Sequence, residues 1–194
     1  TPHWSGKGQM VIYNSADDSV YRIASEVYSG EEAEFRWDYS GSKPYTMYYV
    51  ANCQFREYDV KTGKTALIHD FGSDFPGCGR ILNDVEGDSS ADSNYWAWMV
   101  QGEYDGVSCP MIAIITYDKK NDSVTGKLDY AKYKAMGGRE DTLPRPNMVD
   151  ISPLGTKVVA LFGRTDNKDV FDGPHAYDFD FSHPVKVCND QSHS

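Results

Sequence analysis

Short runs of apolar, aromatic and β-branched residues recur along the chain, separated by polar segments rich in Gly, Asp, Asn and Ser. Four of these runs each follow a Ser-containing turn: QMVIYN, YTMYYVA, YWAWMVQ and KVVALFG. A second run follows each of them: SVYRIA, QFREYDV, MIAIITYD and HAYDFDF. Residues of this kind suit the pleated surface of a β-sheet. The pattern therefore predicts antiparallel strands almost throughout, with at most one short helix, at 130–136.

The turns that precede the first runs form an internal repeat. Its copies are marked by Ser5, Ser40, Ser90 and Ser152. In copies two to four the second run carries a Tyr-Asp pair, at Tyr58-Asp59, Tyr117-Asp118 and Tyr177-Asp178. In the first copy the same spacing leads to Ile23, without the tyrosine. Each copy reads as strand, tight turn, strand, loop, strand, tight turn, strand, which is one four-stranded antiparallel blade of a β-propeller.

The repeat resembles that of TolB-like propellers, whose turn signature reads Trp-Ser-Pro-Asp-Gly. Here HWSGKG lacks the proline, and DISPLG lacks the tryptophan and the aspartate. We expect an all-β propeller of about four blades that forms part of a larger ring. The blades expected are approximately 1–33, 34–83, 84–145 and 146–194. The alternatives are that residues 188–194 complete the first blade, or that the fold is an antiparallel sandwich.

Long connections are expected on one face of the propeller. They are 72–83, 102–109, 131–146 and 164–174. Elaborate loops on a rigid scaffold commonly carry binding and catalytic residues, so this face is the candidate site. The alternative is that the same loops pack against a neighbouring domain.

The first strands of the blades carry acidic residues near their turns. Asp38, Asp88 and Asp150 each lie two positions before an anchor serine, and Arg36 precedes Asp38 by two more. Positions of equal parity share one side of a strand, so these side chains are predicted to line a polar side of the channel. Converging carboxylates favour a divalent cation such as Ca²⁺. The alternative is that each aspartate accepts backbone hydrogen bonds of its own turn.

Two histidines are predicted near the long-loop face. His175 begins a third strand, and His193 lies where the next first strand should begin. The arrangement resembles, at the level of the fold, propeller polysaccharide lyases of the oligogalacturonate and ulvan types. The resemblance implies His175 or His193 as the base, and Arg145 or Arg139 as the cation that stabilises an enolate. Arg36 and Gln191 are further candidates for binding substrate, and the alternative for each histidine is a structural role.

Composition narrows the function classes. The formal net charge of −10 disfavours nucleic acid and anionic lipid surfaces. No apolar stretch approaches the roughly 20 residues that span a bilayer, and no motif indicates a nucleotide or organic cofactor. The four cysteines, Cys53, Cys78, Cys109 and Cys188, allow two disulfides in three connectivities, or buried free thiols.

Two functional hypotheses follow. The first is a secreted or periplasmic propeller that binds an extracellular polysaccharide and, in its stronger form, cleaves it by β-elimination. The second is a propeller without catalytic activity that acts as a scaffold, adhesion or protein-interaction module. The sequence leaves the choice between an enzyme and a binding protein open.

Overall fold

The chain forms a series of antiparallel β-sheets. The structure, a computed structural model, describes residues 6–29, 35–51, 53–82, 89–104, 107–136, 145–163 and 174–187. The first sheet is a hairpin of β1 (Gly6–Asn14) and β2 (Ser19–Ser29). The only helix among the described residues is α1 (Tyr130–Ala135), which confirms the expectation of a single short helix.

Three four-stranded sheets follow the hairpin, each with its strands in chain order. The second sheet contains β3 (Phe35–Trp37), β4 (Thr46–Ala51), β5 (Gln54–Asp59) and β6 (Lys64–Asp70). The third contains β7 (Cys78–Leu82), β8 (Tyr95–Tyr104), β9 (Val107–Asp118) and β10 (Ser123–Asp129). The fourth contains β11 (Arg145–Ile151), β12 (Lys157–Gly163), β13 (His175–Asp178) and β14 (Val185–Lys186).

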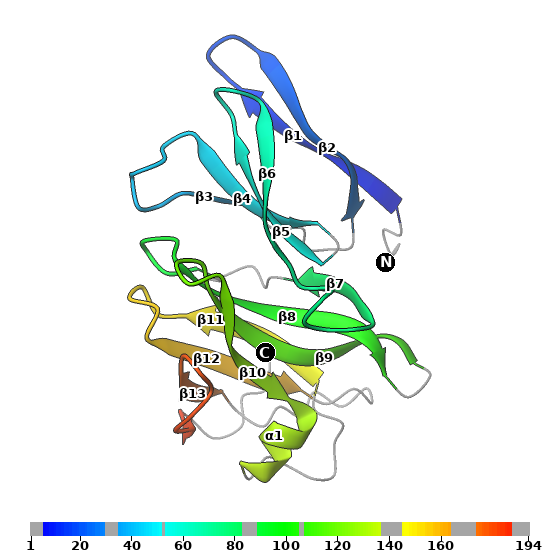
Figure 1. The fold of residues 1–194 in the computed structure, drawn as a ribbon, viewed down its shortest axis with the longest axis vertical. Coiled ribbons are helices and arrows are strands. Elements are labelled where there is room, and N and C mark those ends of the chain that lie inside the picture. The colour runs from blue at the N-terminus through cyan, green and yellow to red at the C-terminus, as the bar shows by residue number, and fades with distance from the viewer. Residues whose placement is uncertain are drawn as a thin grey trace, which may run out of the picture.

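Successive sheets pack face to face in chain order, from the hairpin at the top of Figure 1 to β11–β14 at the bottom. Strand β8 shows why, because its buried residues alternate between two neighbours. Trp96 and Trp98 join a core with the β3–β6 sheet, whereas Ala97 and Met99 join a core with the β11–β14 sheet. Since side chains on a strand point to opposite faces in turn, each run of buried residues serves two interfaces.

This repetition of four-stranded meanders, each packed on the next, is a β-propeller-like fold and confirms the predicted fold class. The first strand of a sheet packs against the middle strands of the sheet before it, as β11 does against β8 and β9. A simple two-sheet sandwich would cover only one face of each sheet, whereas the β7–β10 sheet is covered on both.

The hairpin corrects one detail of the predicted repeat. QMVIYN and SVYRIA were expected as the second and third strands of a blade, joined by a loop, but the strands they form are joined by the short turn 15–18. The turn of this hairpin has the same pattern as the turn between β9 and β10, since Tyr13 bonds to Asp18 as Tyr117 bonds to Asp122. The hairpin therefore corresponds to the third and fourth strands of a blade.

The antiparallel order gives each sheet two different ends. The short-turn end, on the left of Figure 1, carries the turns 15–18, 38–45, 60–63, 119–122, 152–156 and 179–184. The long-connection end carries the β6–β7, β8–β9, β10–β11 and β12–β13 connections. Some residues that were expected there as loop belong to strands. Strand β7 begins at Cys78, β8 continues to Tyr104, and β9 begins at Val107.

A disulfide at the long-connection end joins two sheets. Cys53, between β4 and β5, bonds to Cys78 at the start of β7. This decides one pair among the connectivities that the sequence left open. Cys109 lies within β9, and Cys188 lies outside the described residues.

Candidate functional site

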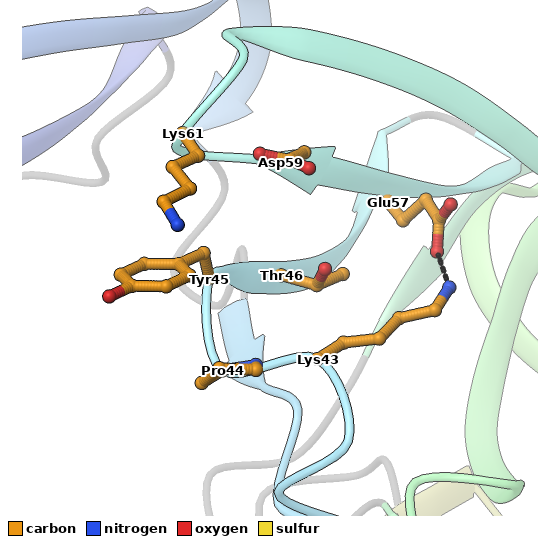
Figure 2. A pocket seen from close by; sticks show the side chains of 7 residues that line it. All are labelled: Lys43, Pro44, Tyr45, Thr46, Glu57, Asp59 and Lys61. Atoms are coloured by element: carbon orange, nitrogen blue, oxygen red, sulfur yellow. Dashed lines mark hydrogen bonds and ion pairs between the residues drawn. The ribbon is translucent and has the colours of Figure 1, made fainter.

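A shallow hollow of about 270 Å³ opens at the short-turn end of the β3–β6 sheet (Figure 2). It is lined by Lys43, Pro44, Tyr45, Thr46, Glu57, Asp59 and Lys61. The turn before β4 and the end of β5 supply these residues side by side because the backbone N–H of Val60 donates to the carbonyl of Tyr45 at 2.9 Å. Tyr45 is 50% exposed, so part of its surface remains accessible to a ligand.

One lysine lies against this ring, and a second lines the hollow beside Glu57. Lys61 Nζ lies 4.6 Å from the centre of the Tyr45 ring, within the range of a cation–π contact. Lys43 Nζ forms an ion pair with Glu57 Oε2 at 3.0 Å. The hollow thus combines an aromatic face, two cations, two carboxylates and a hydroxyl within one small concave surface. An aromatic face with polar groups at its rim is suited to a ligand that has both apolar C–H faces and hydroxyl or carboxylate groups.

A partly buried series of hydrogen-bonded side chains joins the second and third sheets. Lys119 Nζ, in the turn after β9, donates to the hydroxyl of Tyr48 at 2.7 Å. That hydroxyl donates to Asp38 Oδ2 at 2.9 Å. Lys119 Nζ also lies 4.0 Å from the centre of the Tyr48 ring. The three side chains therefore form a continuous path from the β3–β4 turn to the β9–β10 turn.

Burial controls the acid–base properties of Tyr48 and Lys119. It raises the pKa of the Tyr48 hydroxyl well above its ordinary value, and the hydrogen bond to Asp38 and the charges of Asp38 and Glu57 add to the effect. Burial also lowers the pKa of the Lys119 ammonium, opposed by the charges of Asp38 and Glu57. A phenol held neutral in this way donates a hydrogen bond rather than serving as a phenolate base.

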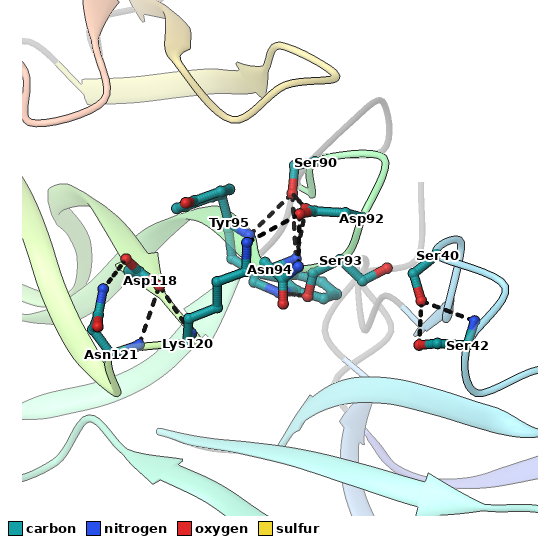
Figure 3. A network of polar contacts seen from close by, with 11 residues as sticks. Ser40, Ser42, Ser90, Asp92, Ser93, Asn94, Tyr95, Asp118, Lys120 and Asn121 are labelled. Atoms are coloured by element: carbon teal, nitrogen blue, oxygen red, sulfur yellow. Dashed lines mark hydrogen bonds and ion pairs between the residues drawn. The ribbon is translucent and has the colours of Figure 1, made fainter.

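The anchor serines of the repeat hold the tight turns together (Figure 3). Ser90 Oγ accepts from the backbone N–H groups of Asn94 and Tyr95 at 3.3 and 3.0 Å. Ser152 Oγ accepts from the fourth and fifth residues after it in the same way, at 3.1 and 3.0 Å. Ser40 Oγ accepts instead from the backbone N–H of Ser42 at 3.1 Å, so all three described anchor serines bind backbone N–H groups of their own turns.

The same turns bond to one another across sheets. The backbone N–H of Tyr39 donates to Ser93 Oγ at 3.1 Å, and that of Ala91 donates to the carbonyl of Pro153 at 2.8 Å. Within this network the pKa of Asp92 is about 2: partial burial opposes the shift, but hydrogen bonds from Ser90 and Asn94 outweigh it. The short-turn end is therefore a connected polar layer.

The repeated Tyr-Asp pairs have two separate structural roles. The tyrosines are buried between sheets: Tyr58, Tyr117 and Tyr177. The aspartates cap the turns that follow them, as Asp59 Oδ1 accepts from the backbone N–H of Thr62 at 2.9 Å. Neither residue of the pair lies in a position that indicates catalysis.

A histidine that the sequence did not single out connects the second and third sheets. His69, on β6, contacts Asp122 Oδ1 through Nδ1 at 2.8 Å and Asp74 Oδ2 through Nε2 at 2.7 Å. Asp122 also accepts from the hydroxyl of Tyr117 at 2.6 Å. Hydrogen bonds from Tyr117 and then from His69 lower the pKa of Asp122. Since carboxylates only accept, both contacts are satisfied when both ring nitrogens donate.

The predicted acidic positions form no metal site among the described residues. No group of three or more His, Cys, Asp or Glu side chains there is placed to hold a metal ion. Asp38 bonds to Ser40 and Tyr48, and Asp150 Oδ1 accepts from the adjacent backbone N–H of Ile151 at 2.6 Å. These contacts fit the alternative prediction, in which each aspartate accepts hydrogen bonds from the backbone of its own turn. Asp88 lies outside the described residues, so the calcium hypothesis stays a prediction.

The predicted catalytic residues are placed only in part. Arg145 begins β11 and His175 begins β13, so both lie at the long-connection end of the fourth sheet, on strands separated by β12. The His175 ring lies 6.2 Å from that of Tyr177. Arg36 lies on β3 opposite Tyr48, away from these two residues. His193, Arg139 and Gln191 lie outside the described residues.

Sequence reasoning missed the hollow and the Asp38–Tyr48–Lys119 chain because it searched the opposite end of the sheets. One local signal was available. Lys43-Pro44-Tyr45 lengthens the first turn of the second sheet and puts an aromatic residue at its exit. The contact of Lys119 with Tyr48 spans 71 positions and has no such signal.

No protein-family model and no curated protein matches the chain. Among solved structures it is similar to a eukaryotic initiation factor, at 11% identity over 97% of this chain and 52% of that one, with a TM-score of 0.32. It is also similar to a chain of a mitotic checkpoint complex, at 10% identity over 96% of this chain and 75% of that one, with a TM-score of 0.29. The chain thus spans about half the length of the initiation-factor chain. At such identities no residue role is carried over.

Proposed function

We propose that this chain is a β-propeller module that acts outside the cytoplasm and binds an extracellular polysaccharide in the hollow beside Tyr45. The observation that carries the proposal is the half-exposed Tyr45, with the Lys61 ammonium against its ring. A pyranose ring has apolar C–H faces that pack on an aromatic ring, and its hydroxyl groups bond to the polar rim. Because the Lys61 ammonium lies against the ring, the preferred polymer in this proposal carries carboxylates, as a uronate polymer does.

The disulfide supports a location outside the cytoplasm. Bonds such as Cys53–Cys78 form and persist in oxidising compartments and are rare where thiols are kept reduced. A secreted or periplasmic location is therefore part of the proposal. Among the described residues no helix is long and apolar enough to cross a membrane.

We also propose that the repeat of this chain is related to that of TolB-like propellers. Its support is the common geometry of the turns at Ser90 and Ser152, in which the serine binds backbone N–H groups four and five positions on. A test is the structure of the complete ring in the parent protein, which should show the geometry of Ser90 and Ser152 in most of its blades; Ser40 departs from it and accepts from the backbone N–H of Ser42.

The binding proposal is tested with polygalacturonate and, as a neutral polymer, dextran. Isothermal titration calorimetry should show binding of polygalacturonate by the wild type and a loss of about tenfold in affinity for Tyr45→Ala, which is about 1.4 kcal/mol. Tyr39→Ala is the matched control, because Tyr39 is an exposed tyrosine of the same turn that does not line the hollow. Equal affinities for the wild type and Tyr45→Ala would refute the role of the hollow.

Cleavage by β-elimination is a second candidate activity, at a site separate from the hollow, and its support is the shared position of Arg145 and His175 at the long-connection end of the fourth sheet. An unsaturated product absorbs in the ultraviolet, so incubation with polygalacturonate shows whether it forms. His175→Ala should abolish that signal if His175 is the base. No signal with the wild type would restrict the function to binding.

A further inference from the structure

A lysine placed over a tyrosine recurs at the short-turn end of the second and third sheets. In the second sheet, Lys61 Nζ lies 4.6 Å from the centre of the Tyr45 ring. In the third sheet, Lys120 Nζ lies 5.3 Å from the centre of the Tyr95 ring. Each lysine comes two positions after the aspartate of a Tyr-Asp pair, so the two occupy the same place in the repeat. The feature that defines the hollow is thus present again one sheet further along.

The strand register agrees with this equivalence. Tyr95 lies opposite Asp118 on the neighbouring strand. Thr46, which follows Tyr45 directly, lies opposite Asp59 in the same way. The two tyrosines therefore differ by one position in the repeat, and both stand where the chain leaves the serine turn and enters a strand.

The fourth sheet forms the same turns without this pair. Lys157 takes the place of Tyr95 in the register, opposite Asp178, and forms an ion pair with it. Asp180 takes the place of Lys120, two positions after the aspartate of its Tyr-Asp pair. Since the turns close without a lysine over a tyrosine, the pair is not a requirement of the repeat. A role in binding explains its presence on two neighbouring sheets.

The second pair also has a carboxylate beside it, as the hollow does (Figure 3). Lys120 Nζ lies 3.5 Å from Asp92 Oδ2, and the two side chains are 54% and 47% exposed. In the hollow, Lys43 forms the corresponding ion pair with Glu57. Tyr95 itself is partly exposed. Both places thus offer a tyrosine, an accessible ammonium and an accessible carboxylate to the same kind of ligand.

Lys119 lies between the two places. Its ammonium donates to Tyr48, which lies opposite Glu57 on the neighbouring strand, and Glu57 lines the side of the hollow away from Tyr45 (Figure 2). Burial has the largest effect on the pKa of Lys119, and the charges of Glu57 and Asp92 act on it too, so both carboxylates lie close to it. Among the described residues the Tyr48 hydroxyl is its only hydrogen-bond acceptor, whereas an ammonium has three N–H donors. Donors therefore remain for a ligand that passes over it.

We propose that the binding site extends from the hollow past Lys119 to the Lys120–Tyr95 pair, and that it takes a linear uronate oligomer rather than a single sugar. This inference rests on the proposed function, because the hollow is its first subsite. Sheets packed face to face lie about 10 Å apart, so subsites on two successive sheets are filled by different sugar residues of one oligomer. The ammonium groups pair with uronate carboxylates, and Glu57 and Asp92 accept hydrogen bonds from sugar hydroxyls.

The test compares digalacturonate with a long galacturonate oligomer by isothermal titration calorimetry. The wild type should bind the long oligomer more tightly, because a second contact on the same molecule adds to the first. Lys120→Gln keeps a side chain of similar reach and removes the charge. It should weaken binding of the long oligomer about tenfold and leave binding of digalacturonate unchanged. Lys157→Gln, at the same end of the fourth sheet, is the matched control and should bind both ligands like the wild type.

Lys119→Gln is the second variant and should weaken binding of the long oligomer in the same way, with circular dichroism to show that both variants are folded. Equal affinities of the wild type, Lys119→Gln and Lys120→Gln for the long oligomer would overturn the extended site and leave the hollow in place. A different result would count against the hollow itself: wild-type affinity of Tyr45→Ala for digalacturonate, or no binding of either ligand by the wild type. In that case the extended site falls with it.

Discussion

The two interfaces between four-stranded sheets have the same geometry but different chemistry. The interface between the β3–β6 and β7–β10 sheets is mainly aromatic, with Tyr48, Phe55, Phe71, Trp96, Trp98 and Tyr117 in its core. The interface between the β7–β10 and β11–β14 sheets is mainly aliphatic, with Ala97, Met99, Ile114, Leu128, Val149, Ile151, Val158 and Ala160. Since β8 supplies residues to both, one strand carries two interface chemistries on its two faces.

The difference shows what aromatic packing requires around it. Trp96 Nε1 donates to the carbonyl of Ser93 at 3.0 Å, and the hydroxyls of Tyr48 and Tyr117 donate to Asp38 and Asp122. Such partners favour the burial of tyrosine and tryptophan, so polar residues gather at the edge of the aromatic interface. Trp98 Nε1 is the exception among the described residues, since it is buried without a hydrogen-bond partner. The aliphatic interface needs fewer hydrogen-bond partners, and here the backbones of two sheets come close together. A Cβ added to Gly126 would lie 2.9 Å from backbone atoms of Asp180.

The largest effect is expected from truncation of Phe55 at the centre of the aromatic interface. Its ring centre lies 4.8 and 4.9 Å from those of Trp98 and Trp96, and it is fully buried. Phe55→Ala should lower the free energy of unfolding by about 4 kcal/mol, measured by chemical denaturation. Leu128→Ala in the aliphatic interface is the comparison and should cost about 3 kcal/mol. The comparison fails if Leu128→Ala is clearly the more damaging change.

The disulfide should have the second largest effect, and it lies at the aromatic interface. Cys53 and Cys78 are 25 positions apart, and the bond restricts the unfolded chain. Replacing both cysteines by serine should lower the free energy of unfolding by about 3 kcal/mol. The measurement is chemical denaturation of the variant and of the reduced wild type, whose free energies of unfolding should agree. Equal stability of oxidised wild type and variant would contradict this role.

The smallest effect concerns Asp122, and it depends on pH. Because its pKa is lower in the folded chain than its ordinary value of 3.8, ionised Asp122 stabilises the fold above that pH, and the stabilisation is lost as the pH falls through the folded-state pKa. The side chain is 67% exposed, so solvent screening limits the contribution to less than about 1 kcal/mol. Asp122→Asn should therefore be less stable than the wild type near neutral pH and approach it in acid. Parallel stability curves from neutral to acid pH would show that the network adds nothing.

Features that depend on near neighbours were predictable from the sequence. The strands follow from alternating apolar residues, and the serine turns and the Tyr-Asp turns close within five positions, as Ser152 does with Lys157. The position of the first hairpin within its blade could not be predicted. Its two apolar runs fit the second and third strands of a blade as well as they fit the third and fourth. Its true position became clear only from the pairing of Tyr13 with Val20.

The sequence by itself determined the class of the fold and the meaning of its repeat, because these rest on alternation and on hydrogen bonds between near neighbours. Only the tertiary structure decided which side chains meet across sheets. His69 meets Asp122 over 53 positions, and Lys119 meets Tyr48 over 71. The physical reason is that such contacts depend on how two sheets are set against each other, and that setting is the sum of many buried contacts rather than a property of any one segment.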